Sequence, residues 1–272
     1  MAMRFNVLGV GISAINMQDS LATIQGWVNR GESHYITVTG VHGVMESQGD
    51  EEIRRIHNRA GMVTPDGMPM VWLGRRAGHS HMTRVCGPDM MLEVFKESVT
   101  QGYRHFLYGG NEGVPELLKN RLEEKFPGVD IVGAYSPPFR PLTEDEDQNI
   151  VTMINESRAD IVWVGLSTPK QERWMAAHVG RLDASVLVGV GAAFDFNADL
   201  KSRAPLWMQQ SGLEWLYRLL DEPKRLWKRY LINNPLFVLR VIGQTLGLKR
   251  YTDDWSQGKQ DEDCSSKLIN QT

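Results

Sequence analysis

The chain has 272 residues, of which 42% are hydrophobic and 23% are charged, as in an ordinary folded protein with one large α/β domain or one domain plus an appendage. Its net charge of -3 gives no sign of general nucleic-acid binding. The two cysteines, Cys86 and Cys264, lie far apart and outside any CxxC pattern. This argues against a disulfide framework or a structural zinc site and suits a reducing cytoplasm.

Short apolar runs alternate with helical patterns over the first two hundred residues. Helical spacing of apolar side chains marks Leu21 to Val28 and Leu117 to Phe126, and Asp50 opens another helix with acidic residues. The apolar runs are continuous, as expected of strands covered on both faces. They are residues 5–8, 35–39, 105–108, 129–132, 161–166 and 185–190. The alternation predicts an α/β fold with a mostly parallel, Rossmann-like sheet that binds ligands at the carboxyl ends of its strands.

The first glycine motif, Gly9 to Ala14, follows an apolar run and resembles the GxGxxA pattern of dinucleotide-binding sites. The acidic residue expected about twenty positions later is missing, and Ile15-Asn16 is a poor helix opening. We therefore favour a tight turn over a dinucleotide site.

A second glycine motif, Gly109-Gly110-Asn111, joins an apolar run to a helical segment with Pro115 in its first turn. Such a turn can present backbone N–H groups and a helix N-terminus to a phosphate. The Lys-Ser/Thr ending of a P-loop is absent, which argues against a nucleoside triphosphatase. A phosphate site and a structural turn remain equally good interpretations of this motif.

No metal site is expected. The acidic segments 145–147 and 261–263 have the Asp-x-Asp pattern that holds a metal in many glycosyltransferases, but neither follows a strand. The first is better explained as charge at a helix N-terminus and the second as part of a polar tail. His79 and His81 lack further ligands nearby in the sequence, so a structural role is favoured.

Three polar segments lie in expected loops, and one of them directly follows an expected strand. Asp66 stands between proline and glycine, Arg84 ends a basic stretch, and Gln171 follows the strand at 161–166. Asp66 alone is fully explained as a turn residue. We expect the three segments to converge at one edge of the sheet, where a carboxylate, a guanidinium and an amide suit removal of a hydroxyl proton and release of a diphosphate.

The character of the chain changes near residue 196. Residues 201–250 contain ten Lys/Arg and three acids, a local charge of +7, so the remainder has about -10. Trp and Tyr alternate with the basic residues, and Pro205, Pro223 and Pro235 divide the segment into three expected helices. The composition suits a solvated face, single-stranded nucleic acid or anionic lipid, and the apolar stretch 236–242 favours lipid. We expect a catalytic domain at 1–195, a basic helical appendage at 196–251 and a disordered tail at 252–272.

Neither a signal peptide nor a membrane span is expected. The N-terminus leads directly into a strand-like run without a basic region and an apolar stretch. The segment 231–248 is interrupted by polar and charged residues, so it could lie on a membrane without crossing it.

Six segments together resemble the WecG/TagA/CpsF family of bacterial glycosyltransferases (glycosyltransferase family twenty-six). They are "TPDGMPMVWLGR", "RVCGPDMM", "FLYGGNEGV", "VWVGLSTPKQERWM", "GVGAAFDF" and "RAPLWMQQSGLEWLYRLLDEPKRLWKRY", in family order between about residues 5 and 250. The resemblance implies an inverting, metal-independent enzyme without a cofactor. The expected donor is UDP-N-acetylmannosamine or UDP-glucose, and the acceptor is a sugar hydroxyl on undecaprenyl diphosphate, in exopolysaccharide, teichoic acid or surface antigen synthesis.

The resemblance also implies residue roles. Asp66 matches the catalytic base, and Arg84 and Gln171 match the essential arginine and glutamine. The donor would lie over Gly109, Gly110 and Asn111 and near Asp195. The basic residues of the appendage would bind the acceptor diphosphate at the inner face of the cytoplasmic membrane. They are Arg218, Arg225, Lys228 and Arg229.

One segment departs from the family pattern. N-acetylmannosamine transferases have a Thr-x-Asn-Pro-Glu-like segment after the second strand, whereas this chain has Thr39, then His42 and no asparagine. The resemblance implies that this segment lines the substrate site, so Thr39 and His42 are expected near the donor or acceptor, and the identity of the sugar is open. His42 either binds a sugar hydroxyl or is structural.

Two other classes of function remain as alternatives. A peripheral membrane scaffold of a polysaccharide assembly complex rests on the appendage alone. An NAD-dependent oxidoreductase rests only on Gly9 to Ala14. The sequence gives no sign of nucleic-acid partners and leaves a homo-oligomer open.

Overall fold

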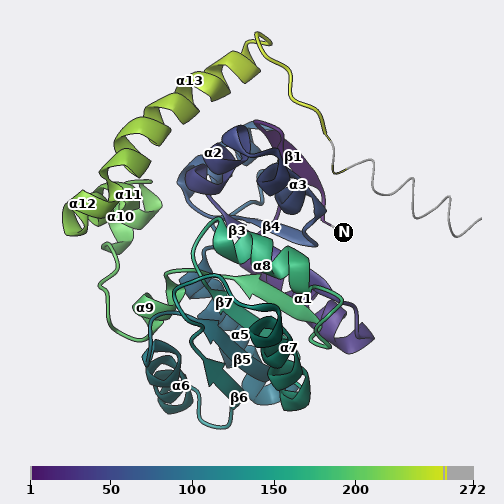
Figure 1. Cartoon of the computed structure of the whole chain (residues 1–272). Helices are drawn as coiled ribbons and strands as arrows, with labels where there is room; N and C mark the ends of the chain where they lie inside the picture. Colours follow the sequence, from purple (N-terminus) through teal and green to yellow (C-terminus); the bar gives the residue numbers. More distant parts are fainter. Residues whose placement is uncertain (1, 254, 256–272) are drawn as a thin grey trace, which may run out of the picture.

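A six-stranded parallel sheet forms the centre of the computed structural model, which describes residues 2–253 and 255 (Figure 1). Its strand order is β4-β3-β8-β7-β5-β6, and every neighbouring pair is parallel. The strands are β3 (His34–Thr39), β4 (Met62–Pro65), β5 (Arg104–Gly109), β6 (Asp130–Tyr135), β7 (Ile161–Gly165) and β8 (Val186–Gly189). The predicted α/β class is confirmed. Strand β4, whose four residues end in proline, was not predicted from the sequence.

Two hydrophobic layers cover the faces of the sheet. Along β7, Val162 and Val164 pack into one layer and Ile161 and Trp163 into the other, because successive side chains point to opposite faces. Side chains of α2 (Val41–Gly49), α3 (Glu51–Arg59), α4 (Met68–Arg76), α7 (Glu144–Ser157) and α8 (Lys170–His178) join the first layer. Those of α1 (Met17–Arg30), α5 (Gly87–Gln101), α6 (Val114–Lys125) and α9 (Ala193–Asn197) join the second. Covering both faces explains why the strands are continuously apolar.

The first apolar run is a strand, but it lies outside the main sheet. Strands β1 (Arg4–Val7) and β2 (Val10–Ser13) pair antiparallel. They are joined by Leu8 and Gly9, both with positive φ, as in a two-residue hairpin turn. The expected tight turn is confirmed. A dinucleotide fingerprint needs a strand-to-helix turn in a βαβ unit, which a hairpin is not.

The expectation of a poor helix opening at Ile15-Asn16 was wrong. Asn16 is the N-cap of α1, and its side chain accepts a hydrogen bond from the backbone N–H of Asp19. The Asp19 carboxylate accepts one from the Asn16 N–H in return, which completes a capping box.

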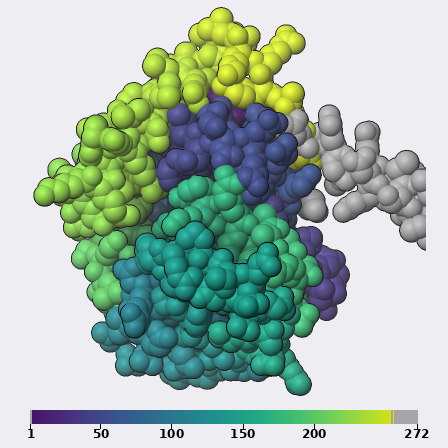
Figure 2. Space-filling model, viewed as in Figure 1, coloured from purple at the N-terminus to yellow at the C-terminus, as the bar shows by residue number. Residues whose placement is uncertain are grey.

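The appendage is helical and wraps over one side of the molecule, against the N-terminal third of the chain (Figures 1 and 2). It contains no strand among the described residues beyond 200, as expected. Three helices were expected, but five helical elements are present. Gly212, with a φ of 73°, separates the first two. Pro235 does not divide the last helix, because it lies in the first turn, where its missing N–H is not needed. They are α10 (Leu206–Gln210), α11 (Glu214–Asp221), α12 (Pro223–Trp227), the π-helix η1 (Lys228–Ile232) and α13 (Asn233–Thr245).

Among residues 2–253 and 255, no helix has both the length and the apolar character needed to cross a bilayer.

Cys86 is a free, buried thiol. The second acidic segment, Cys264 and nearly all of the expected tail lie outside the described residues.

Candidate active site

The predicted site residues follow the carboxyl ends of the strands. Because β4, β3, β8, β7 and β5 are parallel neighbours, their last residues lie along one edge of the sheet. Asp66 comes directly after β4, and its N–H donates to the Thr39 carbonyl oxygen at 3.1 Å. At Gly40 a Cβ would lie 2.6 Å from the Asp66 carbonyl oxygen. Glycine at position 40 therefore lets the two loops approach closely enough to set the backbone of Asp66.

A cavity of about 670 Å³ lies between this edge of the sheet and the appendage. Loops of the catalytic domain contribute His42, Asp66, Arg84 and Thr168, and the appendage contributes Glu214 among others. Five of the residues singled out in the sequence meet in this cavity. They are His42, Asp66, Arg84, Arg218 and Arg229.

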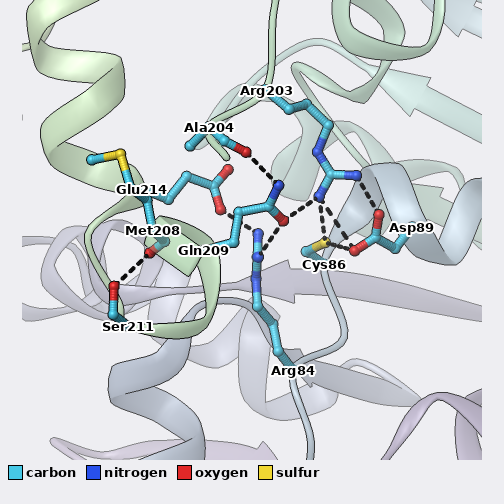
Figure 3. Close-up of polar contacts among 9 residues, drawn as sticks. All are labelled: Arg84, Cys86, Asp89, Arg203, Ala204, Met208, Gln209, Ser211 and Glu214. Carbon is cyan, nitrogen blue, oxygen red and sulfur yellow. Dashed lines mark hydrogen bonds and ion pairs between the residues drawn. The ribbon is translucent and has the colours of Figure 1, made fainter. Parts of the chain in front are cut away.

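Arg84 is tied to the appendage by a network of polar contacts (Figure 3). Its Nη1 donates to Gln209 Oε1 at 3.0 Å, and its Nη2 forms an ion pair with Glu214. Arg203 donates to the same Gln209 oxygen at 3.0 Å and pairs with Asp89 at the start of α5. Gln209 in turn donates to the Ala204 carbonyl oxygen at 2.7 Å. The appendage therefore holds the guanidinium of Arg84 within the cavity.

Burial and charge both act on the Arg84–Glu214 pair. Burial raises the pKa of Glu214, and the nearby Arg84 only partly opposes this effect. Burial disfavours the charge on Arg84, but the surrounding acidic side chains, Asp66 and Glu214 among them, raise its pKa overall. Glu214 and Gln209 were not predicted as site residues. Glu214 is one of three acids in a strongly basic segment, which was the one available signal for it.

Two of the four predicted diphosphate ligands line the cavity. The guanidinium of Arg218 lies 5.6 Å from the centre of the Phe196 ring. Arg229 is more enclosed, and its Nε has no hydrogen-bond partner among the described residues. Burial lowers the pKa of Arg229, as does the nearby Arg218, while Asp66 raises it. The two arginines form a partly unpaired cationic wall beside Asp66, suited to an anionic ligand.

Arg225 and Lys228 lie outside the cavity. Arg225 is exposed and pairs with Glu222 one turn earlier, and the Lys228 ammonium lies 5.5 Å from the centre of the Trp227 ring. The helical positions that bring Arg218 and Arg229 inward thus turn these two side chains toward solvent.

His42 faces the cavity as a neutral imidazole. Burial lowers its pKa to about 3, and the positive charges of Arg229 and Arg218 act in the same direction. Its Nδ1 lies 3.5 Å from a Glu46 carboxylate oxygen and makes no hydrogen bond within the described part of the chain. His42 can therefore exchange a hydrogen bond with a ligand without adding charge to the site.

Gln171 is buried and does not line the cavity. Its Nε2 donates to Glu172 Oε1 at 3.2 Å, and its Oε1 has no partner among the described residues. The Thr168 hydroxyl, which does reach the cavity, donates to the same Glu172 oxygen at 2.8 Å. Burial raises the pKa of Glu172. Gln171 is thus connected to the cavity through Glu172 and Thr168.

Apart from His42, the residues predicted to bind the donor or acceptor sugar share the edge of the sheet but do not line the cavity. At Gly109 (φ 122°) a Cβ would lie 2.7 Å from the Gly165 backbone, so close strand packing explains this glycine. Asp195 is on α9 and pairs with Lys201 Nζ at 2.9 Å. Thr39 is buried and bonded to Thr37 and His57. Gly110 and Asn111 continue the turn after β5, outside the cavity lining.

The first acidic segment serves a helix N-terminus, as expected. Glu146 and Thr143 form a capping box at α7, and Asp147 pairs with His178 and Arg181. His81 Nε2 lies 2.9 Å from the Ala14 carbonyl oxygen. Within residues 2–253 and 255, no three His, Cys, Asp or Glu side chains gather in a way that could hold a metal ion.

Comparison with known proteins identifies the family. The profile of the glycosyl transferase WecG/TagA/CpsF family matches residues 5–251, nearly the whole chain. Three similar proteins are the N-acetylglucosaminyldiphosphoundecaprenol N-acetyl-beta-D-mannosaminyltransferases of Staphylococcus aureus strains NCTC 8325 / PS 47, COL and MRSA252. Each is 24% identical over 249 residues, which cover 91% of this chain and 95% of the relative. The chain therefore belongs to the WecG/TagA/CpsF family and is a glycosyltransferase.

Proposed function

We propose that the protein transfers a hexose or an N-acetylhexosamine from a UDP-sugar to a hydroxyl of a sugar on undecaprenyl diphosphate, with inversion and without a metal. The observation that supports this most directly is the cavity in which Asp66 lies among Arg84, Arg218 and Arg229. A carboxylate beside three guanidinium groups suits a reaction that removes a proton and handles phosphate charge. The names of the staphylococcal relatives describe transfer to a diphosphoundecaprenol-linked sugar.

In the proposed mechanism, Asp66 takes the proton from the acceptor hydroxyl. The hydroxyl oxygen attacks the anomeric carbon on the face opposite UDP, a new glycosidic bond forms, and the bond to the UDP oxygen breaks. The leaving UDP takes the electron pair of the broken bond. Its developing charge needs cationic partners, and Arg84, which lines the same cavity as Asp66, is a candidate.

Arg218 and Arg229 bind the acceptor diphosphate in this proposal. Both reach the cavity, and Arg229 has an unused buried N–H that a phosphate oxygen can accept. The exposed Arg225 and Lys228, next to Trp227, suit anionic lipid headgroups better than the enclosed diphosphate.

The UDP-sugar would approach along the same edge of the sheet from the β5 side. Gly109, Gly110 and Asn111 end that strand, and the Phe194 ring of α9 lies close to Gly110, which brings Asp195 to the same region. In this proposal Gln171 acts indirectly on the cavity, because hydrogen bonds link it through Glu172 to Thr168. His42 would exchange a hydrogen bond with one of the sugars.

We further propose that the appendage docks on the inner face of the cytoplasmic membrane. Outside the cavity, α13 and its C-cap residue present an outer stripe of exposed apolar side chains, Leu236, Leu239 and Leu246. They lie on one side of the helix by their spacing, and basic residues of the appendage flank them. Such a surface would bring the active site to a lipid-linked acceptor.

A panel of UDP-sugars tests the proposed reaction. The protein would be incubated with each donor and with N-acetylglucosamine linked through diphosphate to a polyprenol, and the product linkage would be determined by NMR. One donor should give a product with an inverted anomeric centre, and EDTA should leave the rate unchanged. Retention of configuration or complete inhibition by EDTA would contradict the corresponding part of the proposal.

A further inference from the structure

The active-site cavity has an apolar region as well as a polar one. The polar side chains come from the loop at Asp66, from Arg84 and from the appendage residues up to Arg229. The apolar side chains extend along two helices and form what we call the α13 groove. It consists of Trp72 and Leu73 on α4 and Val238, Val241 and Ile242 on α13.

The groove leads away from the charged end of the cavity. Helix α4 begins two residues after Asp66, and α13 begins four residues after Arg229. Asp66 lies close enough to Arg229 to affect its pKa, so the polar starts of both helices are together. With a rise of about 1.5 Å per residue, the lining from Asn234 to Ile242 extends roughly 12 Å along α13. An elongated ligand with an anionic head at Arg229 therefore meets an apolar wall along its length.

Helix α13 has two apolar faces with different surroundings. Residues 234, 235, 237, 238, 241 and 242 line the cavity. At about 100° per residue, Leu236 lies on the opposite side of the helix, whereas Leu239 and Leu246 lie next to the edge of the lining at Ile242. Val238 and Ile242 remain 53% and 49% exposed although they line the cavity. The described residues therefore leave this apolar lining open along the cavity.

We infer that the α13 groove binds the isoprenoid units adjacent to the diphosphate of the lipid-linked acceptor. This inference rests on the proposed function, which brings a polyprenyl diphosphate to Arg218 and Arg229. The alkyl chain is covalently attached to that diphosphate, so it must leave the cationic site along an adjacent surface. The groove is continuous with the site, apolar and open, whereas other walls of the cavity contain Asp66, Arg84, Glu214 and His42.

Binding of farnesyl diphosphate, measured without vesicles or a UDP-sugar, tests this assignment. Its affinity would be compared with that of inorganic diphosphate by calorimetry or through the fluorescence of Trp72 and Trp215, which both line the cavity. Burial of an isoprene-sized apolar group is worth roughly a tenfold to hundredfold gain in affinity. We expect farnesyl diphosphate to bind at least ~10-fold more tightly than inorganic diphosphate. Equal affinities would overturn the inference.

Matched substitutions on the two sides of α13 test where the isoprenoid chain of the ligand binds. Val238→Asp and Ile242→Asp should remove the advantage of farnesyl diphosphate while inorganic diphosphate binds as before. Leu236→Asp, on the side of α13 opposite the lining, should keep the advantage. Ile242→Trp, which fills the groove without adding charge, should also remove the advantage, and melting curves would show that each variant is folded. If Leu236→Asp lost the advantage and Val238→Asp kept it, the isoprenoid chain would lie on the outer face and the inference would be wrong.

The inference and the proposed function can fail separately. Suppose that no UDP-sugar gives product but the tighter binding of farnesyl diphosphate depends on Val238. The assignment of the groove would then be supported and the proposed reaction would be wrong. If acceptors with a methyl or a farnesyl group on the diphosphate have equal KM values, the proposed reaction would be supported and the assignment of the groove would be wrong. A preference for the farnesyl acceptor that disappears in Ile242→Trp would support both.

Discussion

Arg229 and Arg225 are only four residues apart, yet their surroundings differ. Arg229 lines the cavity with an unpaired N–H, whereas Arg225 is exposed and paired with Glu222. Both match basic residues that the family resemblance assigns to the acceptor diphosphate. Arg229 reaches the cavity and Arg225, four residues earlier in α12, does not, a difference that sequence spacing alone did not indicate.

We expect Arg229→Gln to raise the KM for the lipid-linked acceptor by roughly 10- to 100-fold, because a hydrogen bond between charged groups contributes about 1.5–3 kcal/mol. The KM for the UDP-sugar should change little. Steady-state kinetics with a detergent-solubilised acceptor would measure both. Arg225→Gln is the matched comparison, and an equal rise in that variant would put Arg225 back in the acceptor site.

The elements of the sheet were largely predictable, and the exceptions have physical causes. Continuous apolar runs identified five of the six strands of the sheet because both faces are covered. The hairpin was assigned to the sheet because Gly9-Val10-Gly11 imitates a strand-to-helix turn. Strand β4 was missed because its four residues end in proline.

The contact between Arg84 and the appendage could not be predicted from the sequence. Glu214 lies 130 positions after Arg84, and nothing local to either residue indicates that they pair. The convergence of Asp66 and Arg84 was expected from the rule that strand ends of a parallel sheet meet at one edge. In the structure Asp66 follows the missed strand β4, and the Val85 N–H donates to the Pro65 carbonyl oxygen, which brings Arg84 to the same edge. The same rule placed Gln171 nearby but could not show that its side chain points into the protein.

A double-mutant cycle tests the ion pair between the appendage and the domain. The Arg84 and Glu214 side chains are only 14% and 22% exposed, so removal of either partner leaves a poorly solvated charge. We expect Arg84→Ala and Glu214→Ala each to destabilise the fold, with a coupling free energy of about 1–3 kcal/mol. Chemical denaturation of the two single variants and the double variant would measure it. Strict additivity would mean that the appendage does not depend on this pair.

A buried histidine joins α5, β5 and β7. The Trp163 indole N–H donates to His105 Nδ1 at 3.1 Å, so His105 Nε2 bears the proton and donates to Ser98 Oγ at 2.8 Å. Burial lowers the pKa of His105 to about 3 from the ordinary value of 6.5. A proton on Nδ1 would break the bond to Trp163, so the folded state keeps this histidine neutral.

Stability should therefore fall as the pH decreases from about 6.5 toward 3. In this range the unfolded chain binds a proton at His105 and the folded chain does not, which costs about 1.4 kcal/mol per pH unit. Buried His57, with its pKa lowered by burial to about 4, acts in the same direction. Urea denaturation between pH 7 and pH 4 would measure the slope. The same slope in a folded His105→Gln variant would show that His105 does not cause it.

At the scale of the whole molecule, an α/β domain and a helical appendage enclose one cavity. The appendage supplies Glu214, Arg218 and Arg229 to this cavity and presents the outer stripe next to it. One segment would thereby couple membrane docking to the assembly of the active site.

We expect substitution of the outer stripe to weaken membrane docking. Each leucine of Leu236, Leu239 and Leu246 that enters the bilayer contributes on the order of 1.5–3 kcal/mol, so replacing all three with serine should abolish sedimentation with phosphatidylglycerol vesicles. Exposed Val99 and Met153 in the catalytic domain offer a matched control, because their replacement with serine should leave vesicle binding intact. Undiminished binding of the stripe variant would place the docking surface elsewhere.

The role of Asp66 is the central claim, and the turnover rate of Asp66→Asn tests it most directly. Asparagine keeps the shape of the side chain but cannot accept the hydroxyl proton as a base. With the donor identified by the UDP-sugar panel, kcat should fall by roughly 10²- to 10⁴-fold while the affinity for UDP changes little. Asp145→Asn, at the distant N-terminus of α7, controls for the loss of a carboxylate. An Asp66→Asn enzyme with wild-type kcat would contradict the account.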